Sequence, residues 1–299
     1  MTFERARAVK AYGSLAAVCW LWGTTYLAIR MANETLPLPF FVCGRFLLSG
    51  ALLVAASLLR RDYLPRGREL ADAVVSGILI LGIGNGALIL AEHYIASGIA
   101  ALVVATTPFW MVGIDALFPR GERIHLPSLM GLLVGFGGCA LLVGPELART
   151  GFASGYWKGF VALQVGAAAW SFGSIYSRSR PRRAHPIVTG AFQQLGAGLA
   201  WGPVALLLHH GPITWTARSL EGFFYLVFFG SILGFSAYLY ALDHLPVSVV
   251  SLYSYVNPVV AVWLGWVFYR EPFGLREAAA MAIVFLGVGL VKVQAGKRV

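Results

Sequence analysis

One segment of this chain occurs twice, and this repeat restricts the possible folds more than any other feature. Residues 91–108, AEHYIASGIAALVVATTP, return 150 positions later and without a gap as residues 241–258, ALDHLPVSVVSLYSYVNP. The same offset relates Trp20 to Trp170. Similarity at half the chain length indicates that one structural unit has been used twice.

The composition places both units in a lipid bilayer. Apolar residues make up 58% of the chain and charged residues only 12%, against about 25% charged residues in an average soluble domain. A membrane-spanning helix needs about 20 mostly apolar residues, and ten such segments follow one another with short connections. The expected spans are residues 11–30, 38–59, 70–93, 97–118, 127–145, 156–177, 186–209, 221–243, 246–268 and 275–293. The sequence therefore predicts an all-α integral membrane protein with ten transmembrane helices.

The number of spans decides how the two units are related. Each unit, residues 1–150 and residues 151–299, contains five expected spans. Because five is odd, the second unit enters the membrane from the opposite side, and the two units form an inverted repeat. Inverted repeats place a substrate site near the middle of the bilayer, between units that rock to expose it to either side in turn. This pattern predicts a transporter that works by alternating access.

The basic residues predict the orientation in the membrane. With the N-terminus inside, 16 of the 23 Lys and Arg residues fall in cytoplasmic segments, six fall in outer segments, and Arg45 lies within a span. Cytoplasmic loops carry the excess of Lys and Arg, so both termini are expected in the cytoplasm. The Arg-, Ala- and Gly-rich composition favours a bacterial inner membrane. This distribution explains the net charge of +10, and no nucleic-acid partner is expected.

Two longer motifs resemble the drug/metabolite transporter superfamily, and within it the ten-helix EamA-type exporters. The first half carries HYIASGIAALVVATTPFW, and the second carries LYALDHLPVSVVSLYSYVNPVVAVWLGWVFYREP. Each has a small-residue hairpin followed by a helix that meets a proline. The resemblance covers nearly the whole chain and implies a transporter of two five-helix repeats.

Within this superfamily the chain is most similar to bacterial exporters of amino acids, aromatic ones included, and of related amphipathic metabolites. Efflux of cationic drugs by the same fold is the first alternative. However, the first span, AAVCWLWGTTY, lacks the membrane-embedded Glu of the small multidrug members. The second alternative is an integral-membrane enzyme acting on a lipid-linked substrate, but no nucleophile with a base and no metal-ligand cluster stands out. No catalytic residue, metal or cofactor is expected. The expected partners are a small-molecule substrate and the lipid bilayer, with a monomer as the working expectation.

The two repeated prolines mark the expected centre of the site. Pro108 and Pro258 each remove a backbone donor, so each helix should break or kink there and leave free carbonyl groups. Such groups are tolerated in a membrane only beside protein or a water-filled cavity. Thr107, Tyr255 and Asn257 adjoin the breaks, where they either line a cavity or merely satisfy the freed backbone groups.

Polar and aromatic residues on other spans complete the predicted cavity. An amide at mid-span, such as Asn85, must find a partner or a ligand. Trp20 and Thr24 share a face of the first span, as their repeat equivalents Trp170 and Ser174 do on the sixth. The residues expected to bind substrate are Trp20, Thr24, Asn85, Thr107, Trp170, Ser174, Tyr238, Ser251, Tyr255 and Asn257. For each aromatic residue, packing or anchoring at the interface is the alternative.

Charged residues leave alternatives open. Arg45 either pairs with the carboxylate of an amino-acid substrate, or forms an internal salt bridge to Glu34 or Glu92, or reaches the outer headgroups. Two acid–histidine pairs lie at nearly equivalent positions, Glu92 with His93 and Asp243 with His244. Both pairs are interpreted as solvated and helix-capping. A titrating pair at a gate is the alternative.

Overall fold

The computed structural model describes residues 3–91, 94, 100, 103–119, 121, 123–150, 156–208, 213–269 and 273–296. Every regular element among these residues is a helix. The elements are α1 (Phe3–Asn33), α2 (Leu38–Leu59), α3 (Arg68–Gly77), η1 (Ile78–Asn85), α4 (Gly86–Ala91), α6 (Thr107–Leu117), α7 (Leu126–Thr150), α8 (Tyr156–Ser179), α9 (Pro186–Leu208), α10 (Ala217–Tyr225), η2 (Leu226–Gly234), α11 (Phe235–His244), α12 (Val247–Val250), α13 (Tyr253–Tyr269) and α14 (Leu275–Gly296).

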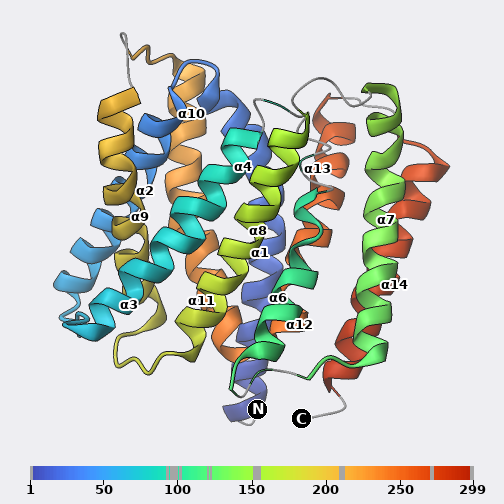
Figure 1. Ribbon diagram of the computed structural model, residues 1–299, viewed down its shortest axis with the longest axis horizontal. Helices are drawn as coiled ribbons and strands as arrows, with labels where there is room; N and C mark the ends of the chain where they lie inside the picture. Colours follow the sequence, from blue (N-terminus) through green and yellow to red (C-terminus); the bar gives the residue numbers. More distant parts are fainter. Residues whose placement is uncertain are drawn as a thin grey trace.

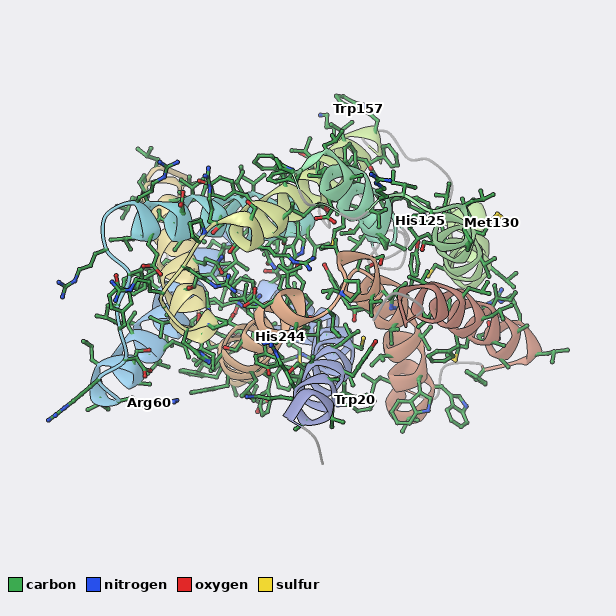
Figure 2. All side chains as sticks on the ribbon, turned by 90° about the horizontal axis from the view of Figure 1, so that it is seen from below. Trp20, Arg60, His125, Met130, Trp157 and His244 are labelled. Atoms are coloured by element: carbon green, nitrogen blue, oxygen red, sulfur yellow. The ribbon has the colours of Figure 1, made fainter. Side chains whose placement is uncertain are left out.

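Helices lie in all ten expected spans and form one bundle (Figure 1). The third span consists of α3, η1 and α4, the eighth of α10, η2 and α11, and the ninth of α12 and α13. Four continuous helices of the described chain are by themselves long and apolar enough to cross a membrane: Ala6–Asn33, Leu38–Leu59, Arg68–Ala91 and Ala217–His244. Large apolar side chains cover the outside of the bundle, and Trp20, Met130 and Trp157 lie at its periphery (Figure 2). The all-α fold predicted from the sequence is confirmed.

The packing of the helices has the symmetry of an inverted repeat. Two seams join equivalent spans, α2 with α9 and α7 with α14. The other large contacts come in matching pairs: the third span packs on the sixth as the eighth packs on the first, and the fourth packs on the sixth as the ninth packs on the first. Both termini lie at one end of the bundle, and α1 runs away from that end whereas α8 runs toward it (Figure 1).

Small residues bring the α7–α14 seam together. A β-carbon on Gly287 would lie 2.7 Å from the carbonyl oxygen of Gly131, so the two backbones touch directly. In the α2–α9 seam, a β-carbon on Gly198 would lie 2.8 Å from the backbone nitrogen of Leu47. Such contacts are how membrane helices associate closely.

A wider, π-helical stretch interrupts the third and the eighth span at nearly equivalent positions. These stretches are η1 and η2, and each is braced by an indole from another span. Trp201 Nε1 donates to the carbonyl oxygen of Gly82 over 3.0 Å, and Trp22 Nε1 donates to that of Gly230 over 3.1 Å. π-Helical stretches are rare and are frequently found at functional sites.

The two repeated prolines differ in their effect on the helices. In the fourth span α6 begins at Thr107, so Pro108 lies in its first turn, and the Thr107 hydroxyl donates to the Val104 carbonyl, which the proline leaves free, over 2.6 Å. In the ninth span the interruption lies at 251–252, between α12 and α13, and Pro258 lies inside α13. The break that was expected at Pro258 therefore lies earlier in the ninth span, at residues 251–252. Pro258 lacks only the bond to Ser254, which lies in the first turn of α13.

Candidate substrate cavity

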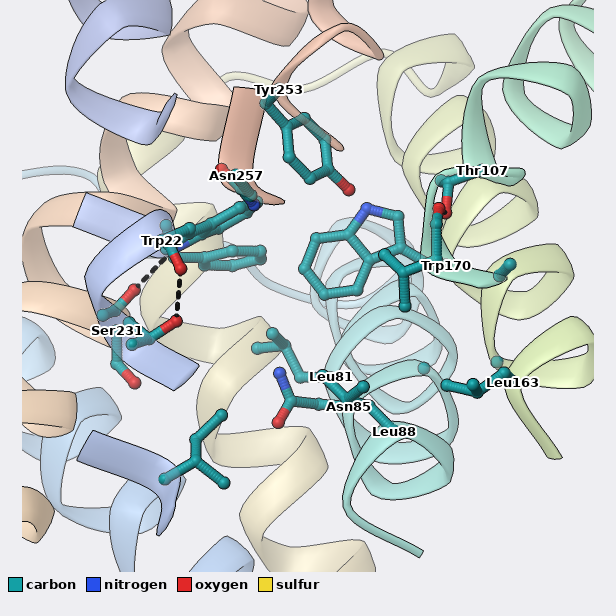
Figure 3. A pocket seen from close by; sticks show the side chains of 18 of the residues that line it. Trp22, Leu81, Asn85, Leu88, Thr107, Leu163, Trp170, Ser231, Tyr253 and Asn257 are labelled. Atoms are coloured by element: carbon teal, nitrogen blue, oxygen red, sulfur yellow. Dashed lines mark hydrogen bonds between the residues drawn. The ribbon is translucent and has the colours of Figure 1, made fainter. Parts of the chain in front are cut away.

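A cavity lies between the two units, deep in the bundle (Figure 3). It contains about 840 Å³ of space free of protein atoms, including the part open to the outside. Its lining residues are Trp22, Thr25, Ile29, Arg45, Phe46, Leu81, Gly84, Asn85, Leu88, Val104, Thr107, Leu163, Gly166, Ala167, Trp170, Gly230, Ser231, Phe235, Tyr253 and Asn257. They come from four spans of the first unit and three of the second, and both π-helical stretches contribute.

Aromatic rings close the end of the cavity that is nearer the chain termini. Trp22 lies at centroid distances of 5.4 Å from Trp170, 5.2 Å from Tyr238 and 5.0 Å from Tyr253. Trp170 Nε1 donates to the Tyr238 hydroxyl over 3.1 Å, and that hydroxyl donates to Ser174 Oγ over 2.7 Å. We call these four rings the aromatic floor. From it the cavity extends past Leu88 and Leu163, toward the end of the bundle opposite the termini.

Few polar side chains reach the cavity, and they differ in how far their hydrogen-bonding capacity is used. Arg45 is 5% exposed, and its Nε donates to Ser231 Oγ over 2.8 Å. The amide nitrogen of Asn257, turned toward its two neighbours, donates to the carbonyl oxygens of Cys19 over 3.2 Å and Tyr253 over 3.0 Å. Asn85 Oδ1 is buried and has no hydrogen-bond partner among the described residues.

A buried polar network links the backbone of Arg45 to the backbone of Ser231. Ser49 donates to the Arg45 carbonyl oxygen over 2.8 Å and also to Gln194 Oε1. Gln194 Nε2 in turn donates to the Ser231 carbonyl oxygen over 3.4 Å. The network joins α2 and η2, the elements that carry Arg45 and its partner Ser231, through α9.

Comparisons with known proteins agree with this architecture. The sequence model of the EamA-like transporter family matches the chain twice, at residues 10–144 and 157–293. The chain belongs to the EamA-like transporter family. The resemblance to this family seen in the sequence is thus confirmed.

The relatives of this EamA-like transporter span most of its length. The uncharacterized inner membrane transporter YedA of Escherichia coli (strain K12) is 36% identical, over 94% of this chain and 90% of YedA. Protein PagO of Salmonella typhimurium (strain LT2) is 28% identical, over 90% of this chain and 88% of PagO. A crystal structure of another protein, 24% identical, matches with a TM-score of 0.80 over 96% of this chain and 98% of the other. That similarity shows a shared fold.

Four of the ten residues predicted to bind substrate line the cavity of this EamA-like transporter: Asn85, Thr107, Trp170 and Asn257. Thr107 and Asn257, each directly before a repeated proline, are equivalent at the 150-residue offset, and here they meet at one cavity from opposite units. The Thr107 hydroxyl also satisfies the carbonyl freed by Pro108. Thr107 therefore both lines the cavity and satisfies a freed backbone group.

The other six predicted residues do not line the cavity. Ser174 and Tyr238 stand directly behind Trp170, and Thr24 shares a hydrogen bond with the Tyr225 hydroxyl on α10. Trp20 is 49% exposed on the outside of the bundle, next to Trp263. The remaining two, Ser251 and Tyr255, are buried.

Tyr255 is the largest departure from the expected site. Its hydroxyl donates to the Leu132 carbonyl oxygen over 2.9 Å, and its ring packs on Gly135 of α7. Ser251 donates to the Ser248 carbonyl oxygen over 2.9 Å. The Tyr255 side chain therefore joins α13 to α7, whereas the bond of Ser251 stays within its own turn. Two residues along a helix turn the side chain by about 200°, so Tyr255 faces α7 while Asn257 faces the cavity.

The sequence analysis missed several cavity residues, above all Trp22, Phe46, Phe235 and Tyr253. A weak signal existed for Trp22, because it lies three residues before Thr25 and therefore on the same face of the first span. The other three are single aromatic residues within apolar runs, which nothing in the sequence distinguishes from residues that face lipid.

The charged residues near the hairpins have ordinary partners where the structure describes them. Asp243 forms an ion pair with Arg182. His244 stacks on Tyr240 at 4.0 Å and donates through Nδ1 to the Tyr240 carbonyl oxygen over 2.8 Å. Glu92 and His93 lie outside the described residues. Among the residues that were described, no group of three His, Cys, Asp or Glu side chains could hold a metal ion.

Proposed function

We propose that this transporter exports amino acids, aromatic ones included, or similar small amphipathic metabolites by alternating access. The observation that carries the proposal is the cavity between the two units, lined by residues from both. An inverted repeat has its substrate site in such a place, because the site can then face either side when one unit rocks against the other.

The chemistry of the cavity supports this class of solute. Its wall carries aromatic rings of Trp22, Trp170 and Tyr253 together with a few fixed polar groups. Apolar walls with a small number of placed polar groups are typical of sites for small organic ligands. A solute with one polar end and one apolar end fits both parts of the lining.

We further propose that the protein resides in a bacterial inner membrane with both termini in the cytoplasm. The name of YedA, an inner membrane transporter, supports the location. The excess of Lys and Arg in segments on the side of the termini supports the orientation. The cavity then extends toward the outer face, as in an outward-facing state.

Counterflow in liposomes tests the function. Liposomes that contain the purified protein and an unlabelled amino-acid mixture should accumulate labelled phenylalanine or tryptophan from the outside, whereas protein-free liposomes should not. Competition by an excess of each unlabelled solute then ranks the substrates. Absence of flux for every amino acid tested would refute the proposal, and flux of cationic compounds alone would favour drug efflux.

Thiol labelling tests access to the cavity. Thr25 lines the cavity, so T25C, made in a chain whose natural Cys19, Cys43 and Cys139 are replaced, should react with a membrane-impermeant thiol reagent added outside. Substrate should slow the reaction. Ser174, buried behind the aromatic floor, supplies the control S174C, which should stay unreactive. Equal labelling of both cysteines would contradict the closed floor.

A further inference from the structure

We propose that Arg45 binds the carboxylate of the substrate, and that the solutes recognised in this cavity are therefore organic acids or zwitterions with an apolar side chain. This inference rests on the proposed function, because it assigns the cavity described above to a substrate. Such a site selects against cationic compounds, whose efflux is the first alternative drawn from the sequence.

Arg45 carries a positive charge that no described carboxylate compensates. The side chain is buried in the second span, where an unpaired guanidinium is costly. No carboxylate of the described residues lies within ion-pair distance of it. The salt bridge to Glu34, one of the alternatives drawn from the sequence, is not formed, because Glu34 pairs with Arg218 over 2.9 Å. A buried cation that lines a cavity and has no anionic partner among the described residues is arranged to receive a mobile anion.

The geometry of the Arg45 guanidinium leaves donors available to a ligand. Its one hydrogen bond to the described residues runs from Nε to Ser231 Oγ. The group lies 5.1 Å from the centroid of the Phe46 ring. A β-carbon on Gly230 would lie 2.9 Å from its Nη2, so a glycine here leaves room for the guanidinium beside η2. The two Nη groups keep their donors for a ligand, and a planar pair of donors matches the two oxygens of a carboxylate.

Other residues of the cavity match the rest of such a ligand. Asn85 Oδ1 is an acceptor without a partner among the described residues, and it belongs to the same cavity. An acceptor of this kind suits an ammonium group. Figure 3 shows Asn85 on one side of the paired indoles of Trp22 and Trp170, and Tyr253 on the other. A zwitterion with an aromatic side chain therefore finds a cation, an acceptor and an aromatic wall in one cavity.

Three matched probes separate the carboxylate from the rest of the ligand. Phenylalanine carries both charges, 3-phenylpropanoate only the carboxylate, and 2-phenylethylamine only the ammonium group. Titration calorimetry on the purified full-length protein should give binding of the first two and at least about 10-fold weaker binding of the amine, since a charge-assisted hydrogen bond to a buried partner contributes about this much. This comparison needs no variant, so it does not depend on the folding of a mutant.

Variants then assign the effect to Arg45. R45Q should weaken binding of phenylalanine and of 3-phenylpropanoate about 10- to 100-fold and leave 2-phenylethylamine unchanged or tighter. R45K keeps the charge without the planar donors, and an intermediate loss is expected. The control R218Q removes one Arg from the exposed pair with Glu34 and should not alter binding.

The outcomes distinguish this inference from the proposed function. Wild-type binding of the amine as tight as that of the acid, carboxylate binding that survives R45Q, or failure of every carboxylate probe to bind would each overturn the role of Arg45. Counterflow of an amino acid would leave the proposed export intact under any of these results. Arg45-dependent binding without any counterflow would instead support the carboxylate site and refute export.

Discussion

Replacing Trp22 with alanine should lower the transport rate about 30-fold at substrate concentrations well below KM. The indole lines the cavity, contacts the three other rings of the aromatic floor, and donates through Nε1 to the Gly230 carbonyl oxygen in η2. Loss of its apolar contact with a substrate corresponds to about 2 kcal/mol, which is about 30-fold in affinity. The floor is also opened, so the two faces of the membrane are no longer well separated.

Trp20 provides the matched control for this experiment. It lies two residues away on the same helix, but it is 49% exposed on the outside of the bundle and touches Trp263. W20A removes an equal volume from the same span and should leave the flux within about two-fold of the wild type. W22F keeps a ring and loses the donor, so its flux should be intermediate.

Initial rates of counterflow, normalised to folded protein in the liposomes, measure both effects. Size-exclusion profiles of each variant show whether it is folded before the rates are compared. Equal losses for W20A and W22A would mean that the first span is oriented differently from the structure. Normal flux for W22A would remove the aromatic floor from the transport pathway.

The comparison of these two tryptophans shows what the sequence could and could not predict. The spans and their order were predicted because a bilayer demands about 20 apolar residues from each helix. The expected second span, residues 38–59, coincides with α2 (Leu38–Leu59). The repeat offset likewise predicted that Thr107 and Asn257 would meet at one cavity.

The rotation of each helix about its axis could not be predicted in the same way. In a soluble protein the polar face of a helix shows which side is buried, but a helix in a membrane is apolar all round. Trp20 and Trp22 differ by about 200° around the helix, and both side chains suit an apolar surface. Trp20 was predicted at the cavity, whereas the structure puts Trp22 there. Tyr255 and Asn257 were both predicted, and only Asn257 lines the cavity.

The π-helical stretches were not predicted either, because their sequences are ordinary apolar runs with glycine. Their positions depend on other spans, since Trp201 and Trp22 supply the donors that occupy the Gly82 and Gly230 carbonyl oxygens. Such tertiary hydrogen bonds leave no local pattern. The cavity residues Gly84, Asn85 and Ser231 lie in these stretches.

The contact between the third and seventh spans, just before η1, should tolerate little added volume. A β-carbon on Gly77 would lie 2.5 Å from the Gln193 α-carbon and closer still to its carbonyl oxygen. Both are backbone atoms, so no side-chain rotation relieves the clash. Gln193 is fully buried, and its Nε2 donates over 2.9 Å to Ser76 and over 2.9 Å to Ser177. Moving α9 away from α3 would break the bond to Ser76 as well.

We therefore expect G77A to lower the free energy of unfolding by about 3 kcal/mol or more, and the Tm by about 10 °C. G82A is the matched control on the same span, because its β-carbon would come only to 3.7 Å from the Ile78 side chain, an ordinary contact. Thermal unfolding in detergent, followed by tryptophan fluorescence, compares the two. If G77A melts with the wild type, the close approach of α3 and α9 is wrong. If G82A is as unstable as G77A, the loss arises from the helical stretch itself and not from its contact with the seventh span.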